Sequence, residues 1–561
     1  MTIKPWLQQY PPCLPETITP PGQASLVELF EQCSKQFADL PALENLGTTF
    51  TYHQWNLLSL RFADYLHRHL QLKPGTRIAI MLPNLLQYPV VLLGALRAGL
   101  TVVNVNPLFT PRELAYELQD SEAEAIVILE NFAYVLEKVL DEVPTHHIIL
   151  TSAGDLCGFP KRQLINTVLK YVRRKVPPYH LPTAIPLRQA LEQGQPVRPE
   201  VTLNQEDLAF LQYTGGTTGT PKGAMLTHGN LLANIEQVRL WLTCEDWHRR
   251  MLIGEEDVVT ALPLYHIFAL TANLWVGLTL GVNNHLITNP RDLKLFVKKL
   301  SKIRFTVLTG VNTLFIHLMH TPGFKQLHFS DLKLTMAGGM SMQKAVAEDW
   351  QQITGSPVIE GYGLTETSPV VTLNPLDIEA FTGSIGLPLP STDCCILDGG
   401  EPQPIGKEGE LCVRGPQVMR GYWKQPEESK AVFTEDGWLR TGDIAKMDDK
   451  GFFYIVDRKK DMILVSGFNV YPNEIEQVIV SHPKVKECAA IGVPDEKTGE
   501  AIKVFVVADD PDLTVKELKI FCRANLTGYK IPKYIEFRDE LPKTTVGKIL
   551  RRQLKEELKD E

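Results

Sequence analysis

The chain has 561 residues, a formal net charge of −8 and 44% hydrophobic residues. A chain of this length exceeds what one hydrophobic core supports, so two or more domains are expected. The negative net charge provides no general attraction to nucleic acid, and no nucleic-acid partner is predicted. An anionic substrate would therefore need positive charge placed at its own site.

The cysteines and the N-terminal segment favour a cytoplasmic location. The nine cysteines include no CxxC pair, and their odd number without a signal peptide indicates a reducing compartment. The first residues lack the apolar segment of a secretory signal. No run of about 18 uninterrupted apolar residues is present, so no membrane span is predicted. The nearest candidate, residues 262–280, is broken by polar residues and a proline.

Short apolar runs alternate with longer amphipathic stretches over roughly the first 370 residues. This alternation predicts parallel sheets with crossover helices, and therefore an α/β fold. The predicted strands are Arg77–Leu82, Leu100–Val105, Ala125–Leu129 and His147–Thr151, and the predicted helices are Tyr52–Leu70 and Pro111–Asp120.

A different pattern begins near residue 384, where short runs are separated by Gly and Pro. This pattern indicates antiparallel β structure, a small β-barrel over about 384–457. Strands at Ala489–Val493 and Ala501–Val507, with helices from Pro472 and Thr514, predict a separate α+β unit. We therefore expect an N-terminal domain over 1–457 and a small C-terminal domain over 461–561. From charge alone, the charged segment at 457–460 is more typical of a solvated β-turn than of an exposed hinge.

The segment Lys161–Lys175 is basic, with apolar positions at helical spacing. Such a helix is typical of a solvated protein surface. It is also the kind of amphipathic helix that lies on an anionic membrane. Both interpretations are kept: a surface helix, and transient peripheral contact with the cytoplasmic face of the inner membrane.

The most specific signal is the segment YTGGTTGTPKGA, which follows an apolar, strand-like run. Its glycines allow positive φ and close approach to a ligand, and successive N–H groups in such a loop bind anions. Threonine hydroxyls and a lysine add donors and positive charge, so the loop suits a polyphosphate. It is not a Walker A loop, because proline precedes the lysine and glycine follows it. The residues are Tyr213, Thr214, Gly215, Gly216, Thr217, Thr218, Gly219, Thr220, Pro221, Lys222, Gly223 and Ala224.

This loop resembles the signature of the adenylate-forming superfamily, which includes acyl-CoA synthetases, firefly-type luciferases and peptide-synthetase adenylation domains. Further segments match that superfamily in the expected order along nearly the whole chain. The run from Asp436 to Ile463 is similar to the signature of the bacterial long-chain fatty-acid–CoA ligases of fatty-acid degradation. The matching segments are LPLYHIF (Leu262–Phe268), EGYGLTET (Glu360–Thr367), RTGD (Arg440–Asp443), DRKKDMI (Asp457–Ile463) and PKTTVGKILRR (Pro542–Arg552).

The resemblance implies a set of catalytic residues. Glu366 would be the ligand of Mg²⁺, because a carboxylate beside a triphosphate is repelled unless a cation lies between them. Lys548 would place a positive charge between the attacking carboxylate and the α-phosphate. Thr214 of the phosphate loop would complete this set together with His266, which stands beside an aromatic gate at Phe268.

The remaining substrate contacts also follow from the resemblance. Asp443 and Arg458 would bind the ribose, since a carboxylate accepts well from two vicinal hydroxyls. Lys460 matches the family's hinge position, so the resemblance implies a hinge at 458–460 and a mobile C-terminal domain. Ser466 and Gly467 would help to form the tunnel for the thiol of coenzyme A. The adenine slot would be formed by Gly338, Gly339, Glu360, Gly361, Tyr362 and Gly363.

Together these features predict a long-chain fatty-acid–CoA ligase that uses a fatty acid, ATP and coenzyme A, with Mg²⁺ as cofactor. Only nine residues follow Arg552, so a diffusible thiol is favoured over a fused carrier protein. Three alternatives stay open: a fatty-acyl-AMP ligase without coenzyme A, a ligase for a short or aromatic acid, and a catalytically silent lipid-binding or uptake protein. No sequence signal determines the oligomeric state, and a homodimer is one of the alternatives.

Overall fold

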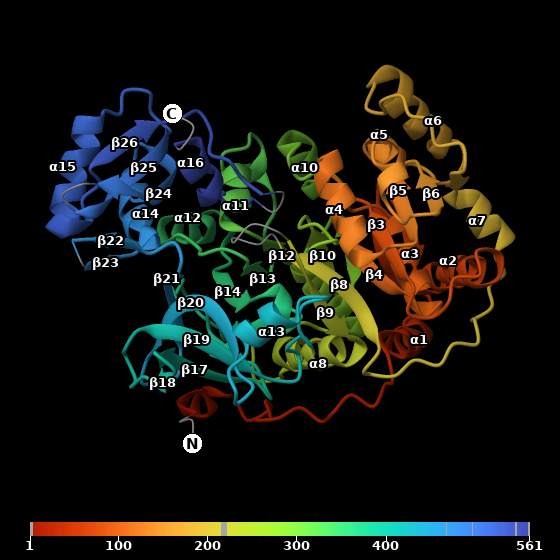
Figure 1. Ribbon diagram of the computed structural model, residues 1–561, viewed down its shortest axis with the longest axis horizontal. Coiled ribbons are helices and arrows are strands. Elements are labelled where there is room, and N and C mark those ends of the chain that lie inside the picture. Colours follow the sequence, from red (N-terminus) through yellow and green to blue (C-terminus); the bar gives the residue numbers. More distant parts are fainter. Residues whose placement is uncertain (1–3, 215–220, 467, 496–497, 545–546, 559–561) are drawn as a thin grey trace.

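The computed structural model describes residues 4–214, 221–466, 468–495, 498–544 and 547–558. Four sheets organise this part of the chain (Figure 1). Two are mainly parallel and lie in the large N-terminal region, one is antiparallel, and the fourth belongs to a separate C-terminal unit. The predicted α/β fold with a small α+β C-terminal unit is confirmed.

A seven-stranded sheet contains all four strands predicted in the first part of the chain. Its order is β7-β6-β5-β3-β4-β8-β9, and every pair is parallel except β8 with β9. The carboxyl end of β8 therefore leads directly into the phosphate loop, and β9 returns beside it. The strands are β3 (Arg77–Met81), β4 (Thr101–Asn104), β5 (Ala125–Leu129), β6 (His147–Thr151), β7 (Ile185–Pro186), β8 (Leu208–Thr214) and β9 (Lys222–Thr227).

A nine-stranded sheet carries the residues predicted for the adenine slot, on β14 and directly after β13. Its order is β16-β15-β14-β13-β12-β10-β11-β1-β2, parallel from β14 to β1 and antiparallel at both ends. The strands are β1 (Pro41–Asn45), β2 (Thr48–Thr51), β10 (Asp257–Thr260), β11 (Asn283–Leu286), β12 (Val307–Gly310), β13 (Leu334–Ala337), β14 (Val358–Gly363), β15 (Val370–Leu373) and β16 (Leu387–Pro388).

Helices of the large region start where the sequence supplies a cap. Thr51, Thr110 and Thr227 each accept from the N–H three residues on and form capping boxes. The helix α3 is buried along its whole length, within an apolar core that takes residues from both parallel sheets. The helices are α1 (Leu26–Gln36), α2 (Tyr52–Asp64), α3 (Gln87–Arg97), α4 (Pro111–Ser121), α5 (Ala133–Glu137), α6 (Lys161–Thr167), α7 (Leu187–Gln193), α8 (His228–Thr243), α9 (Val276–Leu280), α10 (Leu293–Leu300), α11 (Asn312–Met319) and α12 (Lys344–Thr354).

The region expected to be a small barrel is a five-stranded antiparallel sheet of order β18-β17-β19-β20-β21. In the described residues β18 and β21 are its two edges, so the sheet is open, with α13 (Pro426–Val432) between β19 and β20. The N-terminal segment packs on it, where Trp6 is buried beside Phe453. The strands are β17 (Asp393–Asp398), β18 (Glu401–Pro402), β19 (Gly409–Arg414), β20 (Leu439–Met447) and β21 (Phe453–Arg458).

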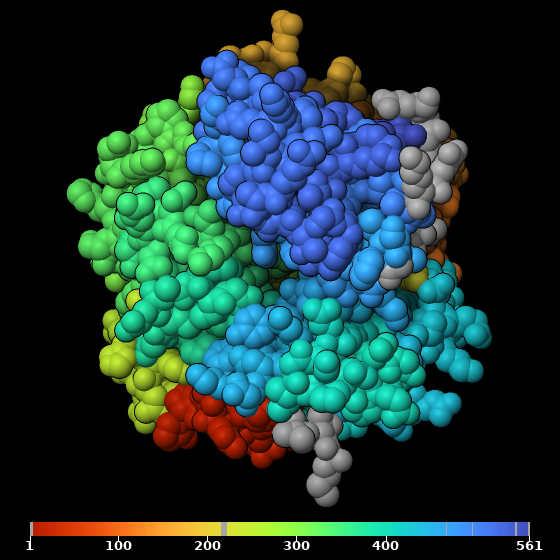
Figure 2. Space-filling model, turned by 90° about the vertical axis from the view of Figure 1, so that its left-hand side faces the viewer, coloured from red at the N-terminus to blue at the C-terminus, as the bar shows by residue number. Residues whose placement is uncertain are grey.

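The C-terminal unit has its own apolar core and sits over the large region (Figure 2). The strands predicted here are present and longer than expected, because β24 and β25 form an extended antiparallel pair. Its strands are β22 (Ile463–Val465), β23 (Phe468–Val470), β24 (Val485–Asp495), β25 (Gly499–Ala508) and β26 (Tyr534–Phe537), and its helices are α14 (Pro472–Val480), α15 (Val515–Asn525) and α16 (Arg551–Glu557).

One cysteine pair corrects the interpretation of the cysteines. Cys13 and Cys244 form a disulfide across 231 residues of sequence, with Cα atoms 5.7 Å apart. The pair joins the N-terminal segment to the end of α8, so no short sequence spacing could reveal it. The cysteine pattern therefore gives no support to a reducing compartment. In the described residues no helix is long and apolar enough to cross a membrane.

Candidate active site

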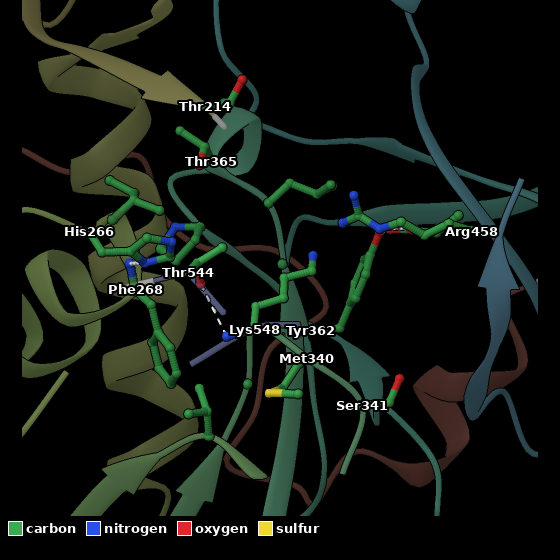
Figure 3. A pocket seen from close by; sticks show the side chains of 18 of the residues that line it. Thr214, His266, Phe268, Met340, Ser341, Tyr362, Thr365, Arg458, Thr544 and Lys548 are labelled. Carbon is green, nitrogen blue, oxygen red and sulfur yellow. Dashed lines mark hydrogen bonds and ion pairs between the residues drawn. The ribbon is translucent and has the colours of Figure 1, made fainter. Parts of the chain in front are cut away.

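A cavity of about 1490 Å³ lies between the large region and the C-terminal unit. Both units contribute to its walls, and the predicted catalytic, adenine and ribose residues that the structure describes all line it. Figure 3 shows Thr214, His266, Tyr362, Arg458 and Lys548 around this cavity, although they are far apart in the sequence. The tertiary structure thus collects the separate motifs into one site.

The phosphate loop joins the two strands of a β-hairpin. Thr214, the last residue of β8, pairs with Lys222, the first of β9. Tyr213 donates from its hydroxyl to Asp120 at 2.5 Å, and Tyr116 donates to the Pro221 carbonyl at 2.9 Å. The helix α4 therefore holds both sides of the hairpin. Gly215, Gly216, Thr217, Thr218, Gly219 and Thr220 lie outside the described residues.

Tyr422 joins the predicted metal ligand to the phosphate hairpin. Its hydroxyl donates to Glu366 Oε1 at 2.7 Å, and the Lys222 ammonium lies 5.3 Å from the centre of its ring. Lys222 also forms an ion pair with Glu428 of α13. Tyr422 pairs with Ala224 of β9, so its position is fixed by backbone contacts to the hairpin. Burial and the Glu366 carboxylate raise the pKa of Tyr422, which keeps it a hydrogen-bond donor.

The predicted ribose contacts are organised around Asp443. This buried carboxylate accepts from the Tyr362 hydroxyl at 2.6 Å and forms an ion pair with Arg458 Nε at 3.2 Å. Asp443 and Arg458 are opposite each other on β20 and β21, because the two strands pair in that register. Both residues and the Tyr362 ring line the cavity, where a nucleoside would be bound.

The glycines of the predicted adenine slot allow close packing. A Cβ on Gly363 would lie 2.0 Å from the Pro369 carbonyl oxygen, and a Cβ on Gly338 would lie 3.2 Å from the Phe268 ring. Gly339 has a φ of +79°, a conformation that favours glycine. Gly361 lies at the other side of the slot, against Leu373 of β15.

Glu360 differs from the other predicted adenine residues because its side chain is buried and holds a backbone segment. Its Oε1 accepts from the Met342 N–H at 3.1 Å. Burial raises the pKa of Glu360 to about 8, although this hydrogen bond opposes the shift. Glu360 is therefore neutral near pH 7 and supports the segment after Gly339.

Lys548 lies in a turn that the C-terminal unit contributes to the cavity. The turn is closed by hydrogen bonds from the Lys548 N–H to Thr544 Oγ1 at 3.1 Å and from the Thr544 N–H to the Lys548 carbonyl at 2.7 Å. Burial, together with repulsion from Arg458, lowers the pKa of Lys548 to about 7, with Asp443 opposing the shift. An anion bound beside Lys548 would raise this pKa again and keep the side chain protonated.

His266 is a neutral hydrogen-bonding group beside Lys548. Burial and repulsion from the Lys548 ammonium lower its pKa to about 4. The Phe268 N–H lies 3.3 Å from His266 Nδ1 and donates to it, so the ring proton belongs on Nε2. His266 thus offers an N–H donor at physiological pH and cannot serve as an efficient proton acceptor there.

The residues predicted for the hinge and the thiol tunnel lie at the margin of this arrangement. Lys460 is exposed at the rim of the cavity, two residues after the end of β21. Ser466 is exposed with a φ of +51°, in the turn between β22 and β23, and does not line the cavity. Gly467 lies outside the described residues. The structure therefore does not bring Ser466 to the nucleotide residues.

Sequence reasoning missed two residues that support the site. Tyr422 follows Gly421 as part of an aromatic pair, a pattern that is also typical of core packing. Thr313, on α11, donates to the carbonyl of Gly547 in the Lys548 turn at 3.1 Å. Nothing in a short sequence window relates either residue to its partner, because the partners are 56 and 234 positions away.

Two family comparisons agree with this geometry. The AMP-binding enzyme family matches residues 29–423, and the AMP-binding enzyme C-terminal domain matches residues 474–548. The chain belongs to the AMP-binding enzyme family. Its C-terminal match ends at Lys548, so the family relationship includes the turn that reaches into the cavity.

Curated relatives resemble the chain over nearly its full length. It is 56% identical over 558 residues to a long-chain-fatty-acid–CoA ligase of Escherichia coli O6:H1, covering 99% of this chain and 98% of the relative. It is 38% identical over 561 residues to a long-chain-fatty-acid–CoA ligase of Bacillus subtilis, covering 99% and 98%. Among solved structures, ATP-bound MatB from Rhodopseudomonas palustris has a TM-score of 0.79 and 28% identity, covering 95% of this chain and 99% of that one.

Proposed function

We propose that this protein is a long-chain fatty-acid–CoA ligase that forms AMP and pyrophosphate. The observation that carries the proposal is the meeting of Lys548, Asp443 and Glu366 in one cavity that also has an apolar wall. The relatives named above, which match both domains at up to 56% identity, support a fatty acid as the substrate. Apolar residues of the cavity wall include Val238, Phe268, Ala272, Val370, Leu373 and Ile385.

In the first half-reaction a carboxylate oxygen of the fatty acid attacks the α-phosphorus of ATP. The bond breaks between the α-phosphorus and the oxygen that bridges it to the β-phosphate, so the products are acyl-AMP and pyrophosphate. Asp443 and Arg458 orient the ribose, and the Tyr362 ring lies against the base. Lys548 places its positive charge where two anions approach each other, which lowers the electrostatic barrier.

The residues present fit a Mg²⁺ ion beside the phosphates. Glu366 is a hard oxygen donor in the cavity, and its Oε1 is oriented by the Tyr422 hydroxyl. With Thr214 at the end of β8, it would hold the ion that neutralises the triphosphate. The Tyr422 contact fixes the direction of the carboxylate before the nucleotide enters.

In the second half-reaction the sulfur of coenzyme A attacks the acyl carbonyl of acyl-AMP. The thiol loses its proton, the bond between the carbonyl carbon and the phosphate oxygen breaks, and AMP leaves. The thiol proton passes to solvent as AMP leaves. While Lys548 is in the cavity, burial and its positive charge lower the pKa of His266 to about 4. The neutral ring's Nε2–H is then available to donate to an oxygen of the acyl-adenylate as it forms.

The proposed sequence of half-reactions uses the C-terminal unit in two orientations. In the arrangement described, Lys548 faces the cavity while Ser466 is exposed on the outside. We infer that the unit turns about Lys460, which would withdraw Lys548 and bring the Ser466 turn toward the site. The domains proposed are 1–457, with the open sheet from about 384, and 461–561.

AMP release with palmitate, measured with and without coenzyme A, tests the proposed function. We expect palmitoyl-CoA and AMP in equal amounts. When coenzyme A is omitted, little AMP should be released, because acyl-AMP is not converted to the thioester. Turnover that does not depend on coenzyme A would indicate the acyl-AMP ligase instead. A chain-length series with best turnover on C2–C4 or aromatic acids and none on C12–C18 would contradict a fatty-acid substrate. Absence of ATP consumption with every acid would favour a lipid-binding protein.

The helix α6 supports peripheral contact with an anionic membrane. None of its residues is buried, and it stands at the outer edge of the molecule, away from the C-terminal unit (Figure 1). Phe159, Leu164 and Tyr171 are exposed by 82%, 66% and 69%. Basic residues surround them, a combination that suits the headgroup region of a membrane.

Sedimentation with phosphatidylglycerol vesicles at low salt tests this contact. The Leu164→Ser and Tyr171→Ser double variant should lose most of the binding, because apolar insertion is removed while the charge is kept. Ile520→Ser is the matched control, since Ile520 is exposed by 56% on α15 of the other unit. Equal binding of both variants, or no binding of the wild type, would reject the contact.

A further inference from the structure

We propose that Thr313 is a positioning residue that holds the Lys548 turn in the orientation for adenylation. The inference rests on the proposed function, because it assigns one contact to one of the two half-reactions. Thr313 lies on α11 of the large region, and its hydroxyl donates to the Gly547 carbonyl at 3.1 Å. Gly547 directly precedes Lys548, so this bond joins the two units beside the catalytic charge.

The contact is too close for any residue other than glycine in the turn. A Cβ on Gly547 would lie 2.4 Å from Thr313 Oγ1 and 3.4 Å from Val311 Cγ2. Gly547 also has a φ of +83°, which disfavours residues with a Cβ. The backbone of Gly547 therefore lies directly against the start of α11, with no side chain between them.

The large region presents Thr313 from a rigid position. Thr313 is buried, 5% exposed, in the first turn of α11. Its neighbour Asn312 exchanges two hydrogen bonds with Gln343, donating at 2.9 Å and accepting at 3.0 Å. The start of α11 that carries Thr313 is thus held by hydrogen bonds within the large region, which do not involve the C-terminal unit.

The turn transmits this position to Lys548. The Gly547 N–H donates to the Thr544 carbonyl at 3.0 Å, and the Lys548 N–H donates to Thr544 Oγ1 at 3.1 Å. Because these bonds close the turn, fixing the Gly547 carbonyl also fixes the Lys548 backbone. The contact exists only while Lys548 faces the cavity. It should therefore contribute to adenylation and not to thioester formation, for which the turn is withdrawn.

Separate assays of the two half-reactions test the proposal. Palmitate-dependent exchange of pyrophosphate into ATP reports adenylation, and synthetic palmitoyl-AMP with coenzyme A reports thioester formation. Thr313→Val keeps the shape and removes the donor, so exchange should fall about tenfold through kcat with the KM for ATP nearly unchanged. Thioester formation should stay within about twofold, which also shows that the variant is folded. Thr321 lies just beyond α11, and its hydroxyl donates to the carbonyl of His317 within that helix. Thr321→Val is therefore the matched control and should show no selective loss of adenylation.

A second variant pair tests whether the contact is present during the reaction. Gly547→Ala should reduce exchange more strongly than Thr313→Val, because its methyl group would overlap Thr313 Oγ1. Adding Thr313→Ala removes that overlap but leaves the strain of alanine at a φ of +83°, so only part of the exchange rate should return.

The outcomes separate this inference from the proposed function. Equal losses in both half-reactions, no loss in either, or wild-type exchange in Gly547→Ala would overturn the role of Thr313. If the wild type forms no palmitoyl-CoA at all, the proposed function itself fails.

Discussion

The two halves of the cavity are built in different ways. The phosphate hairpin is held by contacts within the large region: α4 supports β8 and β9, and Tyr422 joins Glu366 to Lys222. The Lys548 turn comes from another unit and meets the large region through the close contact of Gly547 with Thr313. In the proposed function, a preorganised nucleotide site thus faces a positive charge that the C-terminal unit would deliver for one half-reaction and withdraw for the other.

Removal of the Lys548 ammonium should have the largest effect on adenylation. Lys548→Ala should reduce palmitate-dependent pyrophosphate exchange by about 10²–10³, because a group that stabilises the transition state is lost. ATP binding, measured by calorimetry, should change little, since the phosphate hairpin is intact. Thioester formation from synthetic palmitoyl-AMP should be retained.

Lys516→Ala on the exposed side of α15 is the control for Lys548→Ala, and its exchange rate should equal that of the wild type. An unchanged exchange rate in Lys548→Ala would remove the central residue of the proposed mechanism.

A change in the phosphate hairpin of the large region should weaken ATP binding instead. Tyr422→Phe removes the donor to Glu366 Oε1 and keeps the ring beside Lys222. Because hydrogen bonds to charged groups contribute about 1.5–3 kcal/mol, ATP affinity in the presence of Mg²⁺ should fall at least about tenfold. Titration of ATP in EDTA should show a much smaller difference between the variant and the wild type. A loss of equal size in EDTA would mean that Tyr422 does not act through Glu366.

The pH dependence of adenylation should follow the protonation of Lys548. The pKa of Lys548 is lowered to about 7, so the ammonium form dominates below this value and is lost as the pH rises through it. The kcat/KM for ATP in the adenylation half-reaction should then fall by about tenfold per pH unit above about 7.5. In Lys548→Arg this fall should move to higher pH, because arginine stays protonated. A fall at the same pH in Lys548→Arg would assign the titration to another group.

The smallest effect is expected at the outer ion pair of the hairpin. Glu428 holds Lys222 in the absence of nucleotide and is about half exposed. Glu428→Gln frees Lys222 for the phosphates and should raise ATP affinity by no more than about fivefold, since exposed ion pairs contribute up to about 1 kcal/mol. Weaker ATP binding in this variant would show that Glu428 positions Lys222 instead of competing for it.

Much of the fold was predictable because its signals are local. The runs at Ala125–Leu129 and His147–Thr151 are strands with the predicted bounds, since short apolar segments between polar turns suit buried parallel strands. The helix from Pro111 extends to Ser121, one residue beyond the prediction, and Asp120 is thereby placed against Tyr213. The expected barrel is an open sheet, because strand closure depends on pairing between distant segments.

The candidate site was predictable where chemistry is concentrated in a short segment. The phosphate loop was predicted from residue type, and Glu366 and Asp443 from motifs that resemble those of the family in their order. The structure places Thr214, Lys222, Glu366 and Asp443 at one cavity.

Tyr422 and Thr313 were not predicted, because each acts through one atom on a partner far along the chain. The pairing of Cys13 with Cys244 was missed for the same reason, and it removed the support that the cysteine number gave to a reducing compartment.

The sequence by itself determined the alternating α/β pattern, and it predicted the phosphate loop and a set of groups suited to nucleotide chemistry. These properties depend on neighbours within a few residues, whose spacing and chemistry can be read along the chain. The tertiary structure decided which groups share the cavity, how burial sets the pKa values of Lys548 and His266, and which backbone atoms touch across the two units. These depend on desolvation and on distances between remote segments, which exist only once the chain has folded.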